Sequence, residues 1–220
     1  MSPMSGVGAA DDYVTAISGI GQNDLAREIT SLAVDDKSRY SQEMRKGEEL
    51  FKEGEFLDAY NHFKMANIVG QRDPESLLSM MHAQVALSHV SYGLSAFYLE
   101  KALESLPELP ALNMSPKKMY GREQYDYRIG RLRKYLEKNP RDNEAQLVNA
   151  YFLWFEGEHE QAKKALNQAK VNSNSPHLAE AAETFLDAIE AVGSEATTQP
   201  AQEASAQTRP TTAPAELPGL

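Results

Sequence analysis

Hydrophobic residues recur every three or four positions along most of the chain, from about Asn23 to Val192. This spacing places them on one face of an α-helix. Alternation with a period of two, which would predict strands, is not sustained anywhere in the sequence. The pattern therefore predicts an all-α fold.

Two stretches of the chain follow the same pattern. LFKEGEFLDAYNHFKMA at 50–66 and LWFEGEHEQAKKALNQA at 153–169 both carry a Gly, an Ala five residues later and another Ala seven residues after that. A third copy lies between them. Small side chains let two helix axes approach to about 8–10 Å, so the small residues are predicted to lie at helix contacts. Alignment of the three copies brings nine into register: Gly47, Ala59 and Ala66; Ala83, Ser95 and Ala102; Ala150, Ala162 and Ala169.

This pattern resembles the tetratricopeptide repeat, a helix–turn–helix unit of about 34 residues. The resemblance covers about 40–71, 76–107 and 143–174. It implies a short right-handed α-solenoid within 37–192, in which each repeat packs on the next. An ordinary helical bundle with an Ala-rich core is the alternative, but a bundle would not require the shared spacing of Gly and Ala.

The second and third copies are separated by an insertion at 108–142. Residues 125–140, YDYRIGRLRKYLEKNP, have helical spacing through Leu132 and Leu136 and predict the second helix of a decayed repeat. The preceding LPELPALNMSPKKM contains three prolines and predicts an irregular segment.

The two ends of the chain are predicted to differ from its middle. Residues 1–36 are expected to be a loose segment with a helix around Leu25–Ala33. A capping helix is expected at 176–191, with Ser175 as its N-cap. Residues 193–220 are rich in Pro, Thr, Ala and Gln and have almost no large apolar side chain. They cannot bury enough surface to offset their ordering entropy, so a disordered tail is expected.

Composition narrows the class of protein. The 220 residues carry a formal net charge of −10 and a pI of about 5.0, which argues against general attraction to nucleic acid or anionic membranes. The absence of cysteine excludes disulfides, thiolate catalysis and Cys-ligated zinc. The first residues lack the basic and apolar regions of a secretory signal, and no apolar run reaches the ~20 residues of a membrane span. We expect a cytoplasmic protein.

No residue pattern predicts an enzyme. The five histidines form no HExxH motif and no pair with metal-ligand spacing. Gly19 and Gly21 follow no predicted strand and lack the third glycine of a dinucleotide-binding fingerprint. P-loop and nucleophile-elbow motifs are also missing. The sequence predicts no catalytic residue, no cofactor and no metal site.

The segment 117–141 is basic within an acidic chain. It holds nine Lys and Arg residues against three acidic ones, with four tyrosines interleaved. Basic residues with aromatics can hold phosphates and stack on bases, which would suit RNA. The alternative is structural: the basic helix pairs with acidic residues elsewhere, and the tyrosines pack the insertion onto its neighbours. The second interpretation is preferred, so nucleic acid is an unlikely partner.

The resemblance also implies a binding groove, because the first helix of each tetratricopeptide repeat lines a concave face where partner peptides lie. Clamps for chaperone carboxylate tails carry Lys and Asn at positions that here read Met44, Glu48 and Met81, so that clamp is not expected. The groove is instead expected to be apolar and adaptable, because Met and aromatic side chains predominate. Its expected residues are Met44, Glu48, Phe51, Met80, Met81, Gln84, Leu87, Leu147, Val148, Tyr151, Trp154 and Phe155.

An apolar groove of this size rarely stays exposed. It is expected to receive a partner segment or the helix around Leu25–Ala33, or its side chains pack the insertion. The sequence thus predicts a non-enzymatic scaffold or adaptor that binds a peptide or an apolar protein segment. A secretion-type chaperone for apolar clients and an RNA-associated protein acting through 117–141 are the alternatives.

Overall fold

The computed structural model describes residues 28–33, 37–70, 73–171 and 175–198. In these residues every regular element is helical, apart from a single parallel bridge between Ile29 and Met114. The predicted all-α class is therefore confirmed for this part of the chain. The elements are α1 Arg39–Glu53, α2 Phe56–Val69, α3 Pro74–Leu87, α4 Gly93–Ser105, the 3₁₀ turn η1 Leu109–Ala111, α5 Pro116–Tyr120, α6 Arg122–Lys138, α7 Asn143–Phe155, α8 His159–Lys170 and α9 Pro176–Thr198.

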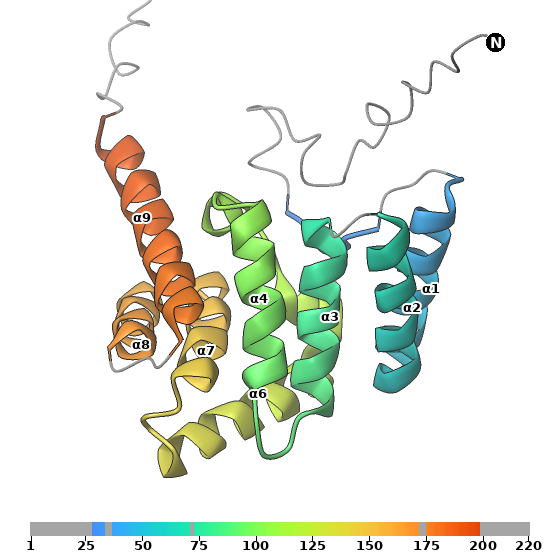
Figure 1. Ribbon diagram of the computed structural model, residues 1–220, viewed down its shortest axis with the longest axis horizontal. Helices are drawn as coiled ribbons and strands as arrows, with labels where there is room; N and C mark the ends of the chain where they lie inside the picture. Colours follow the sequence, from blue (N-terminus) through green and yellow to red (C-terminus); the bar gives the residue numbers. More distant parts are fainter. Residues whose placement is uncertain (1–27, 34–36, 71–72, 172–174, 199–220) are drawn as a thin grey trace, which may run out of the picture.

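Helices that follow one another in sequence pack in pairs: α1 with α2, α3 with α4, and α7 with α8. The pairs stand in a row, with α9 against α8 and α4 (Figure 1). All nine small residues of the repeat pattern are buried. Gly47 shows why size matters there, because a Cβ at this position would lie 2.4 Å from Cε1 of Phe63 on α2.

The turns inside the first and third pairs have the same geometry. Gly54 and Gly157 both adopt left-handed backbone, with φ of 87° and 84°. Gly54 donates its N–H to the carbonyl of Phe51, and Gly157 donates its N–H to the carbonyl of Trp154, each three residues earlier in the chain. Residues with a side chain rarely adopt this conformation, so the two glycines fix matching turns.

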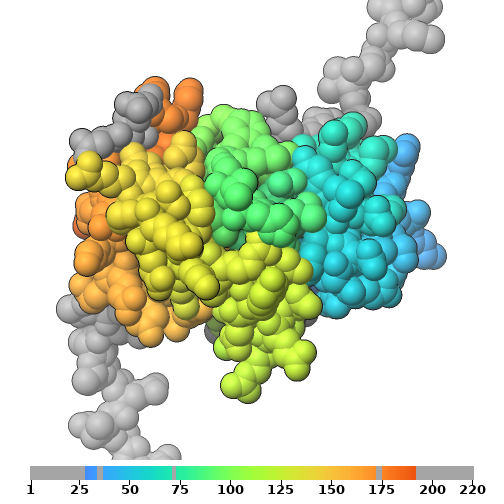
Figure 2. All heavy atoms as spheres, turned by 90° about the horizontal axis from the view of Figure 1, so that it is seen from below, coloured from blue at the N-terminus to red at the C-terminus, as the bar shows by residue number. Residues whose placement is uncertain are grey.

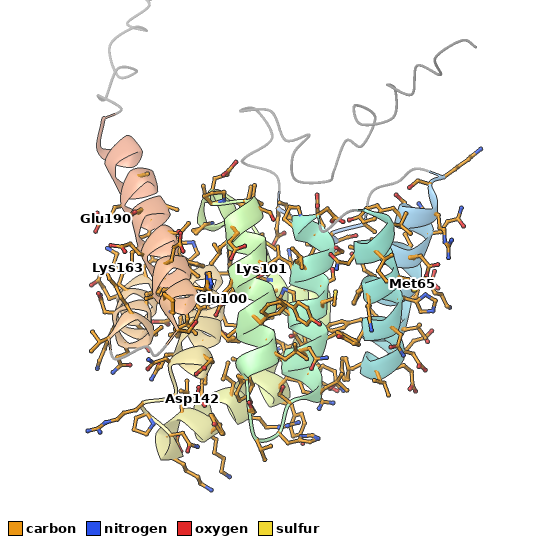
Figure 3. All side chains as sticks on the ribbon, in the orientation of Figure 1. Met65, Glu100, Lys101, Asp142, Lys163 and Glu190 are labelled. Atoms are coloured by element: carbon orange, nitrogen blue, oxygen red, sulfur yellow. The ribbon has the colours of Figure 1, made fainter. Side chains whose placement is uncertain are left out.

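Two helices, α3 and α7, begin with an Asp that caps the helix and also accepts a tyrosine hydroxyl. Asp73 caps α3 by accepting the N–H of Ser76, and its carboxylate also accepts the hydroxyl of Tyr40 at 2.6 Å. Asp142 caps α7 and accepts the hydroxyl of Tyr135 at 2.5 Å. Figure 3 places Asp142 at the lower end of α7, where α6 meets it. Each cap therefore joins its helix to a preceding one.

The insertion at 108–142 does not form a helix pair like the three others. The predicted helix at 125–140 is present as α6, and the proline-rich stretch before it forms only η1 and α5. No fourth pair lies between the second and third, because α4 packs directly against α7. α6 instead runs across the row beneath α4 and contacts α3 and α7 (Figure 1). Seen from below, the insertion (yellow-green to yellow) covers much of that end of the molecule (Figure 2).

The expectations for the two ends need correction where the structure describes them. Residues 28–33 are not helical, in contrast to the expected helix around Leu25–Ala33. α9 begins at Pro176, after Ser175 as expected, but it continues to Thr198 and so passes the expected start of a disordered tail at Gly193. The expectations for 1–27 and 199–220 lie outside the described residues.

Candidate functional site

We call the inner face the side of α1, α3 and α7 against which segments 28–33 and 109–120 pack. Twelve residues are expected from the sequence to line a groove. None of the twelve is exposed. Seven are buried, namely Met44, Phe51, Met80, Met81, Leu147, Val148 and Tyr151, and five are partly buried, namely Glu48, Gln84, Leu87, Trp154 and Phe155. Among them, Glu48, Phe51, Tyr151 and Trp154 contact segments 28–33 and 109–120, so the protein's own chain covers this part of the inner face.

The insertion supplies most of this cover. Tyr120 on α5 is buried, donates its hydroxyl to the carbonyl of His82 at 2.8 Å and packs edge-on against Phe51 at 4.8 Å. Trp154 on α7 donates its indole N–H to the carbonyl of Pro110 at 2.8 Å. The insertion is therefore fixed to the inner face at both α1–α3 and α7.

His82 lies at the centre of the inner face and is buried. Its Nδ1 is 3.3 Å from the hydroxyl of Tyr120, and its Nε2 is 3.1 Å from that of Tyr151. Because Tyr120 uses its proton on the His82 carbonyl, Nδ1 carries the imidazole proton and Nε2 accepts from Tyr151. Burial lowers the pKa of His82 to about 3, so the ring is neutral near pH 7. This histidine joins α3, α5 and α7.

Residues 28–33 form the second part of the cover; the chain pairs like a strand at Ile29 and turns at 31–33. Ile29 donates its N–H to the carbonyl of Asn113 at 2.7 Å and accepts the N–H of Ser115 at 2.9 Å, as in a parallel strand pair. The side chain of Leu32 is 2% exposed. Glu28 forms an ion pair with Lys118.

Glu48 on α1 holds the other end of this segment. Its Oε1 accepts the backbone N–H groups of Leu32 at 2.7 Å and Ala33 at 3.1 Å. Its Oε2 accepts the hydroxyl of Ser31 at 2.7 Å. Charge-assisted bonds of this kind are stronger than those between neutral groups. One carboxylate thus binds three donors of a short turn at 31–33.

A small pocket remains beside Leu32, between segment 28–33 and the helices α1 and α3. Its volume is about 30 Å³, room for water molecules or for a slightly larger side chain than leucine. It is lined by Thr30, Leu32, Glu48, Phe51, Lys52, Phe63, Ser79, His82 and Met119. The segment therefore does not fill the inner face completely.

Most basic residues of 117–141 contact protein groups. Arg128 donates to the carbonyl of Ala86 at 2.9 Å and Arg131 to that of Ser88, at the end of α3 where the helix dipole favours cations. Lys117 and Arg122 pair with Asp126, Lys118 with Glu28 and Arg133 with Glu156. Among the described residues, no partner is found for Lys134, Lys138 and Arg141, which are exposed. Of the four tyrosines, Tyr120 and Tyr125 are buried, Tyr135 is partly buried and Tyr127 is exposed.

Other kinds of site are not found in the described residues. No group of three or more His, Cys, Asp and Glu side chains there could hold a metal ion. No helix among them combines the length and apolarity needed to cross a membrane. No family model, curated protein or solved structure matches the chain. The function is therefore inferred from the geometry of the inner face.

Sequence reasoning preferred a packing role for the tyrosines of the insertion and left open that the groove side chains pack against it, but it did not single out Pro110, Met114 or Tyr120 as the cover of this face. Their stretch has apolar residues without a period, and such a pattern gives no sign of which surface will bury them. It also missed the role of Glu48 as an acceptor of backbone N–H groups. A single Glu on an amphipathic helix carries no sequence signal for that role.

Proposed function

We propose that the protein is a non-enzymatic scaffold or adaptor of tetratricopeptide-repeat type that binds an extended, partly apolar segment of a partner protein on its inner face. The burial of small residues at matching places in three helix pairs supports the repeat assignment. The observation that carries the binding function is the way segment 28–33 is held by Glu48 and by the backbone of Asn113 and Ser115.

That arrangement contains the elements of peptide recognition. When an extended peptide adds to a protein edge, main-chain hydrogen bonds supply affinity, and pockets for individual side chains supply specificity. Here the bridge at Ile29 and the two N–H groups on Glu48 involve only the main chain of the segment. Leu32 supplies the single deeply buried side chain. A segment from another protein could use the same groups.

The alternative functions gain less support. Six of the nine basic residues at 117–141 contact protein groups, and Tyr120 and Tyr125 are buried, so few remain to bind phosphates or stack on bases. A chaperone for apolar clients would use the same inner face and would differ in accepting many sequences. The test below separates these functions.

The full-length protein is incubated with an immobilised array of 12-residue peptides of varied sequence, at low salt and at about 0.5 M NaCl. We expect peptides with spaced apolar residues to be retained at both concentrations, because apolar and main-chain contacts are screened little. Retained peptides are then resynthesised with a photo-reactive group, and their cross-links should map to α1, α3 or 109–120.

Two results would contradict the proposal. One is cross-linking confined to the outer helices α2, α4 and α8. The other is an array without retained peptides while a single-stranded RNA binds and is released steeply by salt, as phosphate contacts require. Retention of most peptides, with little dependence on sequence, would identify the chaperone alternative.

A further inference from the structure

Segment 28–33 contacts the inner face at three separate points. Glu28 pairs with Lys118, Ile29 exchanges two main-chain hydrogen bonds with Asn113 and Ser115, and Leu32 enters the space beside α1 and α3. Between them, Thr30 and Ser31 are exposed, although Ser31 donates its hydroxyl to Oε2 of Glu48 at 2.7 Å and Thr30 borders the pocket beside Leu32. Several anchors along one short segment are the contact pattern of a bound peptide.

Each contact sets a chemical requirement for whatever occupies the site. Lys118 favours an acidic residue at the first position. The second position must not be proline, because its N–H donates to Asn113. The fifth position must be apolar, and the space of about 30 Å³ beside Leu32 also admits a longer side chain such as Met.

Glu48 adds a further requirement. Because it accepts two consecutive N–H groups, neither the fifth nor the sixth position can be proline. Its carboxylate lies close to the bound chain, so an acidic residue at the fifth position would be repelled as well as poorly solvated. The fourth position is served by a hydroxyl, because Ser31 donates to Glu48. The site therefore selects a segment with the pattern acidic, non-proline, any, hydroxyl-bearing, apolar, non-proline.

We propose that Glu28–Ala33 is a built-in occupant of a binding site, and that the partner recognised there carries a segment of this same pattern which displaces it. This inference rests on the proposed function and names the ligand class and the regulation of that site. The groups that bind, namely Glu48, Lys118 and the backbone of 113–115, belong to the body of the protein, so they serve either occupant. A tethered occupant lowers the apparent affinity for a free one, because only the fraction of molecules with an open site can bind.

The test uses the chain's own segment as a free probe. A fluorescein-labelled peptide of residues 24–36, DLAREITSLAVDD, is titrated with full-length protein and followed by fluorescence anisotropy. Leu32→Asp in the protein should release the tethered segment and tighten peptide binding at least about tenfold over the unmodified protein. Leu57→Asp is the matched control, because Leu57 is 60% exposed on α2 and should leave binding unchanged.

Specificity is tested in the Leu32→Asp protein. Glu48→Gln should weaken peptide binding about tenfold, since it removes a charged acceptor of two N–H groups, whereas Glu49→Gln on the exposed side of α1 should not. A peptide that itself carries Leu32→Asp should not bind. Circular dichroism checks that each variant keeps its helices. If Leu32→Asp unfolds the protein, Ile29→Pro replaces it, because it removes only the N–H that bonds to Asn113.

The inference is overturned if a folded release variant binds the peptide no better than Leu57→Asp does, or if the peptide with Asp binds equally well. Failure of this inference differs from failure of the proposed function. A first outcome is that array peptides cross-link equally to the inner face of the unmodified protein and of the Leu32→Asp protein. This result would uphold the scaffold function and reject the tethered occupant. An empty array together with an inert probe would reject both.

Discussion

Acid should destabilise the protein through His82 before its carboxylates are protonated. The ring is buried and neutral, and burial lowers its pKa from 6.5 to about 3. Between these two values the unfolded chain binds a proton that the folded chain does not. The free energy of unfolding must therefore fall as the pH falls through this window, and it is fully retained above pH 6.5. From the two pKa values, this one residue should cost about 2 kcal/mol on going from pH 7 to pH 5.

Urea unfolding at pH 7 and at pH 5 measures this cost. A loss of about 2 kcal/mol corresponds to a fall in the midpoint of about 1 M for a typical small protein. His82→Gln removes the titration while it keeps one donor and one acceptor for the hydroxyls of Tyr120 and Tyr151. The fall should therefore shrink by about 2 kcal/mol in His82→Gln, whatever the stability of that variant at pH 7.

His89→Gln is the control, because His89 lies in the exposed turn after α3. If the fall between pH 7 and pH 5 shrinks equally in this variant, the effect does not come from the burial of His82. If His82→Gln loses as much stability as the unmodified protein between pH 7 and pH 5, the argument from a buried neutral imidazole is wrong.

Two further predictions concern the packing of the helix pairs. Gly47→Ala should lower the free energy of unfolding by about 1–3 kcal/mol, because its Cβ would lie 2.4 Å from Phe63. Gly130→Ala on α6, where the space is open, should raise the free energy of unfolding by up to about 1 kcal/mol. Equal effects of the two variants in urea unfolding would refute the close contact at Gly47. Burial raises the pKa of Glu100, which lies on α4 beside α9 (Figure 3). The fold therefore disfavours the ionised form of Glu100, so Glu100→Gln should raise the melting temperature at pH 7. This gain should disappear at a pH where Glu100 is protonated, and a gain that is independent of pH would refute the cause.

The sequence was informative wherever a local pattern decides the structure. The spacing of apolar residues predicted the helices, because a helix must turn one face to the core. The small residues predicted the contacts, because sterics at Gly47 or Ala59 leave no room for a larger side chain. The end of α9 was missed because the apolar stripe stops before the helix does, and Gly193, Ser194 and the two threonines after it are weak helix formers.

Segment 28–33 shows where local reasoning is insufficient. The spacing of Leu25, Ile29 and Leu32 fits a helix, yet residues 28–33 are not helical, because their N–H and C=O groups bond to 113–115 and Glu48. These partners lie far away in sequence. Propensity is a weak prior that such tertiary contacts override. For the same reason, the sequence offered the insertion and the segment around Leu25–Ala33 only as alternative covers of the groove, and the choice needed the fold.

The two parts of the cover should respond separately to mutation, and the single tryptophan can report this. Trp154 is partly buried, bonded to the carbonyl of Pro110 and stacked on His159 at 4.2 Å, and none of these contacts involves segment 28–33. Leu109→Ala removes a fully buried side chain next to Pro110, at a cost of about 2–5 kcal/mol to the docking of the insertion. It should shift the indole emission to longer wavelength and increase quenching by acrylamide. Leu32→Asp should change neither the wavelength of the indole emission nor its quenching by acrylamide. An equal shift in both variants would mean that the insertion and segment 28–33 leave the inner face together, and a partner would then have to displace both.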